Sequence, residues 1–142
     1  MFTGEYSHSI DAKGRVIVPA KFREELGSSF TITMGFDGCL SMYSGEEWDK
    51  FVNKLSSLPE GRKETRQIQR SFLGKAATCE VDKQGRVLIP LKLRQYAGLE
   101  KDIVFVGINT KVEIWNSDRW EENDISDMDE MAERLAELGI EL

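Results

Sequence analysis

Two aspartate–arginine pairs with the same spacing are the residues of this chain best suited to binding chemistry. Asp11 and Arg15 frame the stretch D-A-K-G-R, and Asp82 with Arg86 frames D-K-Q-G-R. An aspartate at the first position of a turn can accept backbone N–H groups two or three residues on, and its carboxylate can also hold a guanidinium. An arginine held in this way loses less side-chain entropy when it docks on a ligand.

Each stretch also carries a lysine, Lys13 in the first and Lys83 in the second, so each is cationic beyond what its aspartate neutralises. A two-stranded ribbon fits the major groove of DNA, where arginine reads guanine edges and lysine meets phosphate. The alternative is a self-contained fold element, an aspartate-capped turn with a surface arginine partner. On the motif alone both interpretations stand.

The two stretches open a longer duplicated segment, which runs from Asp11 to Gly27 and again from Asp82 to Gly98. At an offset of 71 residues, 8 of 17 positions are identical, where average residue usage would give about one. The similarity continues at an offset of 72, so that Gly35 falls opposite Gly107. This period is longer than the roughly 20 to 50 residues of solenoid repeats, which indicates two halves that share one core.

The elements that must position these stretches follow from the pattern of apolar and turn residues. In each half we expect a hairpin whose two strands are joined by the D-x-x-G-R loop, with Gly14 and Gly85 supplying a positive φ. A short helix should then begin at Pro19 or Pro90 and end at a glycine. Strands are expected at residues 6–11, 15–19, 30–34 and 40–43, and again at 77–82, 86–90, 103–108 and 112–115.

The charge is distributed unevenly along the chain. The net charge is −6, but residues 117–142 alone hold ten acids and two bases. The remainder is therefore slightly basic and free to present a basic face. We expect a final helix capped by Ser126, with an apolar stripe that packs on the body or on a neighbouring subunit: Met128, Met131, Leu135 and Leu138.

At 142 residues the chain fits a single body. We divide it into a first repeat, a basic bridging helix, a second repeat and an acidic C-terminal helix, at residues 1–59, 60–75, 76–125 and 126–142. Cys39 and Cys79 lack metal or disulfide spacing and are expected to be reduced core thiols. The sequence shows no signal peptide and no membrane span, and it predicts no metal, no cofactor and no small-molecule substrate.

An enzyme is the first rival class. A duplicated aspartate loop could bring two carboxylates together as in an aspartic protease, but each aspartate here has an arginine four residues on that would keep it ionised and occupied. His8 is the only histidine, and we expect it to be a strand side chain rather than a catalyst. We therefore predict that the chain is not an enzyme.

The double motif D-x-x-G-R-V-x-[IV]-P, the start MFTGEYSHSID and the [YW]-[SN]-x-x-x-W pattern that closes each half resemble the MraZ family. The resemblance covers the chain from Met1 to about Leu138. It implies an α+β, mainly β fold with short flanking helices: a double-split, swapped-hairpin β-barrel of the AbrB, MazE and MraZ type, built from two internal repeats.

The resemblance also implies a function. Members of the family are ring-forming homo-oligomers that bind double-stranded DNA at short direct repeats upstream of the division and cell-wall gene cluster, in the cytoplasm and at the nucleoid. The DNA contacts map to the loops, with Lys13, Arg15, Lys83 and Arg86 binding and with Asp11, Gly14, Asp82 and Gly85 orienting. A second rival class is an antitoxin-like interaction module, in which the acidic tail binds a protein partner. The acidic tail fits equally well as a solvated helix or as one that covers a neighbouring subunit, and a third possibility is that it inhibits the basic loops.

Overall fold

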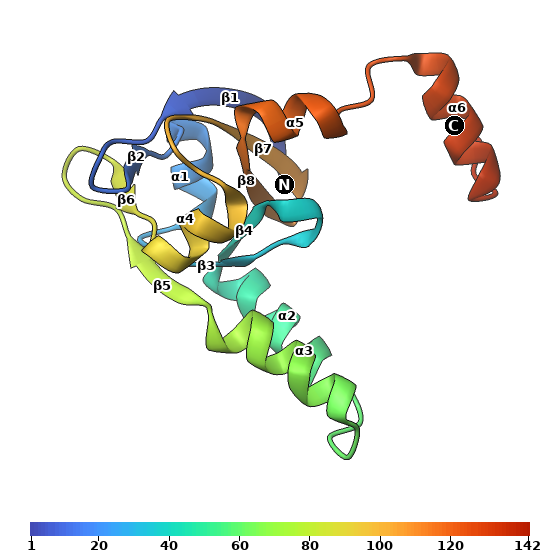
Figure 1. Ribbon diagram of the computed structural model, residues 1–142, viewed down its shortest axis with the longest axis horizontal. Coiled ribbons are helices and arrows are strands. Elements are labelled where there is room, and N and C mark those ends of the chain that lie inside the picture. Colours follow the sequence, from blue (N-terminus) through green and yellow to red (C-terminus); the bar gives the residue numbers. More distant parts are fainter.

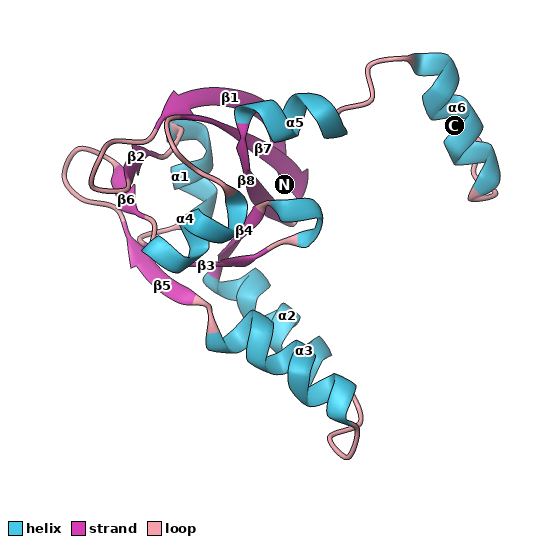
Figure 2. Cartoon of the chain, in the orientation of Figure 1, coloured by secondary structure: helices cyan, strands magenta, loops and turns pink.

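A computed structural model describes all residues 1–142 and contains eight strands and six α-helices (Figures 1 and 2). The strands are β1 (Phe2–Ser9), β2 (Arg15–Ile17), β3 (Ser29–Met34), β4 (Leu40–Ser44), β5 (Ala77–Glu80), β6 (Arg86–Leu88), β7 (Asp102–Asn109) and β8 (Lys111–Asn116). The helices are α1 (Ala20–Leu26), α2 (Gly45–Ser56), α3 (Lys63–Gly74), α4 (Leu91–Ala97), α5 (Ser117–Asn123) and α6 (Met128–Glu137), with a 3-10 turn at Phe36–Gly38. The α+β, mainly β class is confirmed.

The two repeats exchange strands. Six strands form one antiparallel sheet in the order β1-β7-β8-β4-β3-β5, and β2 and β6 form a separate two-stranded ribbon. β1 of the first repeat pairs along its whole length with β7 of the second, from Phe2 opposite Asn109 to Ser9 opposite Asp102. β5 of the second repeat pairs in turn with β3 of the first.

The prediction that each D-x-x-G-R loop joins two strands of one hairpin is therefore wrong. The strands on either side of each loop belong to different sheets, because β2 finds its partner in β6 and β1 finds its partner in β7. A strand of three residues buries too little on its own repeat to hold a hairpin. Crossing to the other repeat lets Val16 and Val87 lie opposite each other with both side chains buried.

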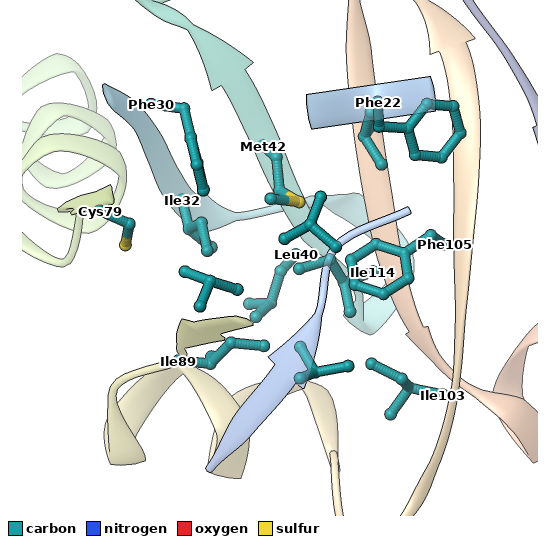
Figure 3. Close-up of a cluster of buried hydrophobic side chains, with 14 of the residues drawn as sticks. Phe22, Phe30, Ile32, Leu40, Met42, Cys79, Ile89, Ile103, Phe105 and Ile114 are labelled. Carbon is teal, nitrogen blue, oxygen red and sulfur yellow. The ribbon is translucent and has the colours of Figure 1, made fainter. Parts of the chain in front are cut away.

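The main hydrophobic core fills the space enclosed by the sheet, the ribbon and the helices α1 and α4 (Figure 3). Both repeats contribute large side chains that are at most 2 % exposed, among them Phe22, Phe30, Ile89 and Phe105. On helices α1 and α4 the buried pairs are Phe22 with Leu26 and Leu93 with Ala97, as the apolar spacing predicts. Neither repeat closes this core alone.

The short helices begin and end close to where the sequence places them. Pro19 and Pro90 are the N-caps of α1 and α4, so each helix begins one residue after the predicted position, at Ala20 and at Leu91. Gly27 and Gly98 follow with φ of 80° and 64°, the left-handed side of φ that favours glycine at a helix end. The Ser44 hydroxyl accepts a hydrogen bond from the Glu47 N–H at 3.3 Å and caps α2, as its sequence predicts.

Helices α2 and α3 form a stalk that projects from the body (Figure 1). Phe51 of α2 meets Phe72 of α3 edge to face, with ring centroids 5.4 Å apart. The Thr33 hydroxyl donates to the Phe72 carbonyl at 2.6 Å and ties the stalk to β3. The edge-to-face aromatic pair stabilises the packing of α2 on α3, and the hydrogen bond fixes α3 against the sheet.

The last helix differs from its prediction. Asp127, rather than Ser126, caps α6, because its carboxylate accepts hydrogen bonds from the backbone N–H groups of Asp129 and Glu130 at 2.9 and 3.3 Å. The apolar stripe of this helix does not pack on the body of its own chain, since the helix stands apart from it (Figure 1).

Cys39 and Cys79 are both buried and free, as predicted. Burial raises the pKa of the Cys79 thiol to about 11, and it raises the pKa of Cys39 further. His8 lies on β1 against the ring of Phe105, as predicted for a strand side chain. None of the helices combines the length and the apolar character that crossing a bilayer requires.

Candidate nucleic-acid interface

The first D-x-x-G-R loop is organised by the carboxylate of Asp11. One oxygen, Oδ1, accepts the backbone N–H groups of Lys13 and Arg15, each at 2.9 Å. The other oxygen, Oδ2, accepts the Nε–H of Arg15 at 2.9 Å. The Asp11 N–H donates to the Arg15 carbonyl, and Gly14 completes the turn with φ of 87°, a conformation that other residues resist.

The second loop repeats this geometry. The Oδ1 atom of Asp82 accepts the N–H groups of Gln84 and Arg86 at 2.9 Å, and Oδ2 accepts the Arg86 Nε–H at 2.8 Å. Gly85 has φ of 79°. In both repeats the aspartate carboxylate thus accepts two backbone N–H groups and the arginine Nε–H of its own loop.

These hydrogen bonds also set the ionisation of the two aspartates. The backbone N–H of the arginine does most to hold the pKa of Asp11 and of Asp82 below the ordinary value. Burial opposes it, and the guanidinium and the second backbone N–H lower the pKa further. Each carboxylate is therefore charged at neutral pH and is fully engaged with its own loop.

The aspartates leave the outer edge of each guanidinium available. Only the Nε–H groups of Arg15 and Arg86 are hydrogen-bonded within the chain, so the terminal Nη groups have no partner there. The two arginine side chains are 32 % and 29 % exposed. A guanidinium anchored at Nε presents its two Nη groups end-on, which is the geometry that can match two acceptors on a guanine edge or on a phosphate.

The two loops are tied to each other across the repeats. The Val18 N–H donates to the Gly85 carbonyl at 3.0 Å, and the Ile89 N–H donates to the Gly14 carbonyl at 2.9 Å. Together with the pairing of β2 and β6, these bonds place both loops side by side at one end of the molecule (Figure 1). Neither loop can turn away from the other without breaking them.

The ribbon gives this end of the molecule an outer face. Val16 and Val87 point inward and are buried, so their neighbours along each strand point outward. Arg15 lies opposite Leu88, and Ile17 lies opposite Arg86. Ile17 and Leu88 are 45 % and 56 % exposed, and the face therefore alternates two guanidinium groups with two aliphatic side chains.

The sequence analysis missed two further arginines at this face. Arg94 of α4 lies behind the first loop, where a Cβ on Gly14 would fall 2.5 Å from its Nε and Cζ atoms. Arg23 of α1 lies behind the second loop in the same way, against Gly85. Each arginine thus supports the loop of the other repeat. The duplication could have identified them, because Arg23 and Arg94 are the same residue at corresponding positions of the two repeats, offset by 71 residues.

We call the surface formed by the two loops, the ribbon and these two supporting arginines the loop face. Lys13 and Lys83 are exposed on it and take part in no ion pair. Six cations stand there against the two aspartates: Lys13, Arg15, Arg23, Lys83, Arg86 and Arg94. The structure thus brings together the eight residues that the sequence assigned to binding and orienting.

Other surface features lack this character. The largest hollow, of about 670 Å³, lies beside α2, and two of its lysines, Lys50 and Lys111, already pair with glutamates. Nowhere in residues 1–142 do three or more His, Cys, Asp or Glu side chains gather in an arrangement that could hold a metal ion.

Comparison with known proteins agrees with the duplication seen in the loops and strands. A family model described as "MraZ protein, putative antitoxin-like" matches residues 1–71 and matches again over residues 72–136. The chain belongs to the MraZ family. The two successive matches correspond to the two repeats that exchange strands in the fold.

Several curated relatives match over almost their whole length. A protein of Lachnoclostridium phytofermentans is 60 % identical over 140 residues, which is 99 % of each chain. A protein of Thermoanaerobacter sp. is 53 % identical over 144 residues, and one of Acetivibrio thermocellus is 52 % identical over 143 residues, each over 99 % of this chain and all of the relative. All three are named transcriptional regulator MraZ. MraZ proteins are thus named as regulators and not as enzymes, in line with the prediction.

Proposed function

We propose that this chain is a sequence-specific, DNA-binding transcriptional regulator that contacts double-stranded DNA through the loop face. The observation that carries the proposal is the pair of guanidinium groups, Arg15 and Arg86, each anchored at Nε and open at both Nη groups. The names of the curated relatives support the regulatory role.

The loop face offers two kinds of contact with DNA. The open Nη groups of Arg15 and Arg86 can donate to O6 and N7 of guanine in the major groove, which is the commonest base-specific contact. Lys13 and Lys83, exposed and unpaired, can meet the phosphates that flank these bases. The aspartates fix the arginines beforehand and reduce the entropy lost on docking.

We further propose that the regulator acts as a ring-shaped homo-oligomer on short direct repeats upstream of the division and cell-wall gene cluster, in the cytoplasm and at the nucleoid. The family resemblance supports this part. One loop face makes few contacts, so a single copy would bind weakly and salt-sensitively. Several copies joined in one assembly would gain affinity by effective concentration, provided that their spacing matches that of the DNA repeats.

The experiment is a gel shift on the DNA upstream of the chain's own gene. The double variant Arg15→Ala/Arg86→Ala should lose specific binding, because Asp11 and Asp82 keep their backbone bonds while the base contacts disappear. The control Arg62→Ala/Arg66→Ala removes the same charge at the N-terminal end of α3. Mass measurement in solution should show the same assembly in all three proteins. Unchanged affinity of the loop variant would reject the assignment.

An antitoxin-like interaction module is the second candidate. The family description contains the word antitoxin-like, and the acidic α6 stands free of the body, as a partner-binding tail would. In that case removing α6 should abolish capture of a small toxin protein encoded next to this gene, whereas DNA binding by the loop face should survive the removal.

A further inference from the structure

Helix α6 has no partner in its own chain. No hydrogen bond and no ion pair joins residues 125–142 to the rest of the protein, and none of their side chains belongs to a hydrophobic cluster of the body. The link after α5 leads the helix away from the sheet (Figure 1). A helix of ten residues is only marginally stable alone in water, which indicates that α6 has a partner in the assembled protein.

The surface of α6 combines an apolar stripe with a strong negative charge. Met128 and Leu138 are 71 % and 73 % exposed, and the helix and the residues after it line an apolar groove of about 480 Å³ that includes Met131, Leu135 and Ile140. Residues 125–142 hold six acids and one base, Arg134. The matching surface must therefore be apolar at its centre and basic around it.

The loop face has this composition. Ile17 and Leu88 supply exposed aliphatic surface on the ribbon, and Leu91, the first residue of α4, is 56 % exposed. Unpaired lysines and open guanidinium groups surround these side chains. Opposite potentials that meet in this way favour docking of the correct partners.

The hollow beside α2 is a weaker match for α6. Its lysines include Lys50, which already lies 3.3 Å from Glu47, and Lys111, which lies 3.9 Å from Glu113. Only Lys54 remains without an ion pair there. An acidic helix would thus gain fewer new charge contacts in the hollow than on the loop face.

The helix and the loop face of one chain do not reach each other. They lie at opposite ends of the molecule (Figure 1), and the link of residues 124–127 spans at most about 14 Å when fully extended. α5 is held to the sheet by Trp120, whose Nε1–H donates to Glu5 at 2.9 Å. A loop face that α6 covers must therefore belong to another copy.

We propose that α6 of one copy docks on the loop face of a second copy and competes there with DNA. This inference rests on the proposed function, since the face is the DNA-binding surface assigned above. When a fraction of the loop faces is covered, the apparent dissociation constant for DNA rises in inverse proportion to the uncovered fraction. The acidic helix therefore raises the DNA concentration that is needed to occupy the loop faces.

The first experiment measures DNA affinity at low salt in the full chain. The tail variant Glu133→Gln/Glu137→Gln/Glu141→Gln removes three acids that take part in no ion pair, and the control Glu121→Gln/Glu122→Gln/Asp124→Asn makes the same change of charge near α5. The tail variant should bind DNA roughly threefold to a hundredfold more tightly, because each of three exposed ion pairs strengthens docking by about 1.4-fold to fivefold, and the control should not. Equal affinities of the two variants would overturn the proposal.

A variant of unchanged charge tests the apolar part of the contact. Met128→Ser/Leu138→Ser alters two side chains that are exposed in the free helix, so helix formation does not depend on burying them. The proposal expects tighter DNA binding here too, because the docked helix would be released. No change in affinity would show that the apolar stripe does not dock on the loop face.

A readout without DNA separates this proposal from the proposed function. Carbodiimide joins carboxylates to amines that are in direct contact, and a mixture of isotope-labelled and unlabelled chains identifies links between copies. Labelled-to-unlabelled links between α6 and Lys13 or Lys83 are expected. Links confined to one copy, or links from α6 to Lys54 in the hollow, would overturn the proposal. Failure of every variant and of the unaltered chain to bind DNA would instead reject the proposed function.

Discussion

Replacing the two loop lysines should change how DNA binding depends on salt. In the variant Lys13→Ala/Lys83→Ala each chain loses two exposed cations that have no carboxylate partner. The hydrogen bonds of both loops remain, since Lys13 takes part only through its backbone N–H and the matching donor in the second loop is the N–H of Gln84. The guanidinium groups of Arg15 and Arg86 should therefore keep their orientation. We expect a selective loss of phosphate contacts.

The size of the effect follows from counterion release. Each phosphate contact contributes about 0.9 to the slope of log affinity against log salt concentration, so two lost lysines should lower the slope by about 2 for every chain that engages the DNA. Between 50 and 200 mM salt the unaltered protein should then lose about tenfold more affinity than the variant for each engaged chain.

Fluorescence anisotropy with a labelled upstream duplex, titrated at several salt concentrations, measures this slope directly. The control Lys54→Ala/Lys63→Ala removes two unpaired lysines from the stalk, and its slope should match that of the unaltered protein. Preference for the upstream sequence over a scrambled one should survive in the lysine variant, because base contacts are assigned to the arginines. An unaltered slope in the lysine variant would refute the assignment of Lys13 and Lys83 to phosphate.

Three further predictions concern stability. Gly107→Ala should lower the free energy of unfolding by about 1 to 3 kcal/mol, because the new Cβ would fall 2.6 Å from the backbone nitrogen of Thr3 on the paired strand. Gly74→Ala should instead raise the free energy of unfolding by about 0.4 to 1 kcal/mol, because a Cβ at this position would meet no atom within 4 Å. Denaturant unfolding at fixed protein concentration would compare the two variants. The pKa of Asp11 and of Asp82 is lower in the folded protein than its ordinary value of 3.8, so the two carboxylates stabilise the fold at every pH above 3.8. This contribution is lost as the pH falls through the lower pKa of the folded state. An Asp11→Asn/Asp82→Asn variant should therefore be less stable at neutral pH, and acid titration of unfolding should show a smaller decline below about pH 4; parallel curves would contradict this account.

The sequence predicted what depends on local chemistry. Aspartate, glycine and arginine at fixed spacing determine a turn through contacts within five residues, so the geometry of both loops could be predicted without knowledge of the fold. The same holds for the serine cap of α2 and for the buried face of α1, where Phe22 and Leu26 follow helical spacing. The duplication predicted one core shared by two halves.

Strand pairing could not be predicted in the same way. The pattern around Arg15 identifies a short strand, but its partner at Arg86 is 71 residues away, and alternation within a strand does not name the partner. The same limit explains why Arg23 and Arg94 were missed, since each acts on the loop of the other repeat. The cap of α6 was misplaced by one residue because Ser126 and Asp127 are both good caps and only the backbone geometry selects between them.

The exchange of strands also affects how the protein is made. β1 leaves the ribosome long before its only partner, β7, which begins at Asp102. Contacts between segments so distant in sequence form slowly, because the chain between them must first be brought into a closed loop. The nascent chain therefore carries an unpaired strand until most of the protein has been synthesised. A polypeptide that stops after the first repeat lacks the strand that pairs with β1.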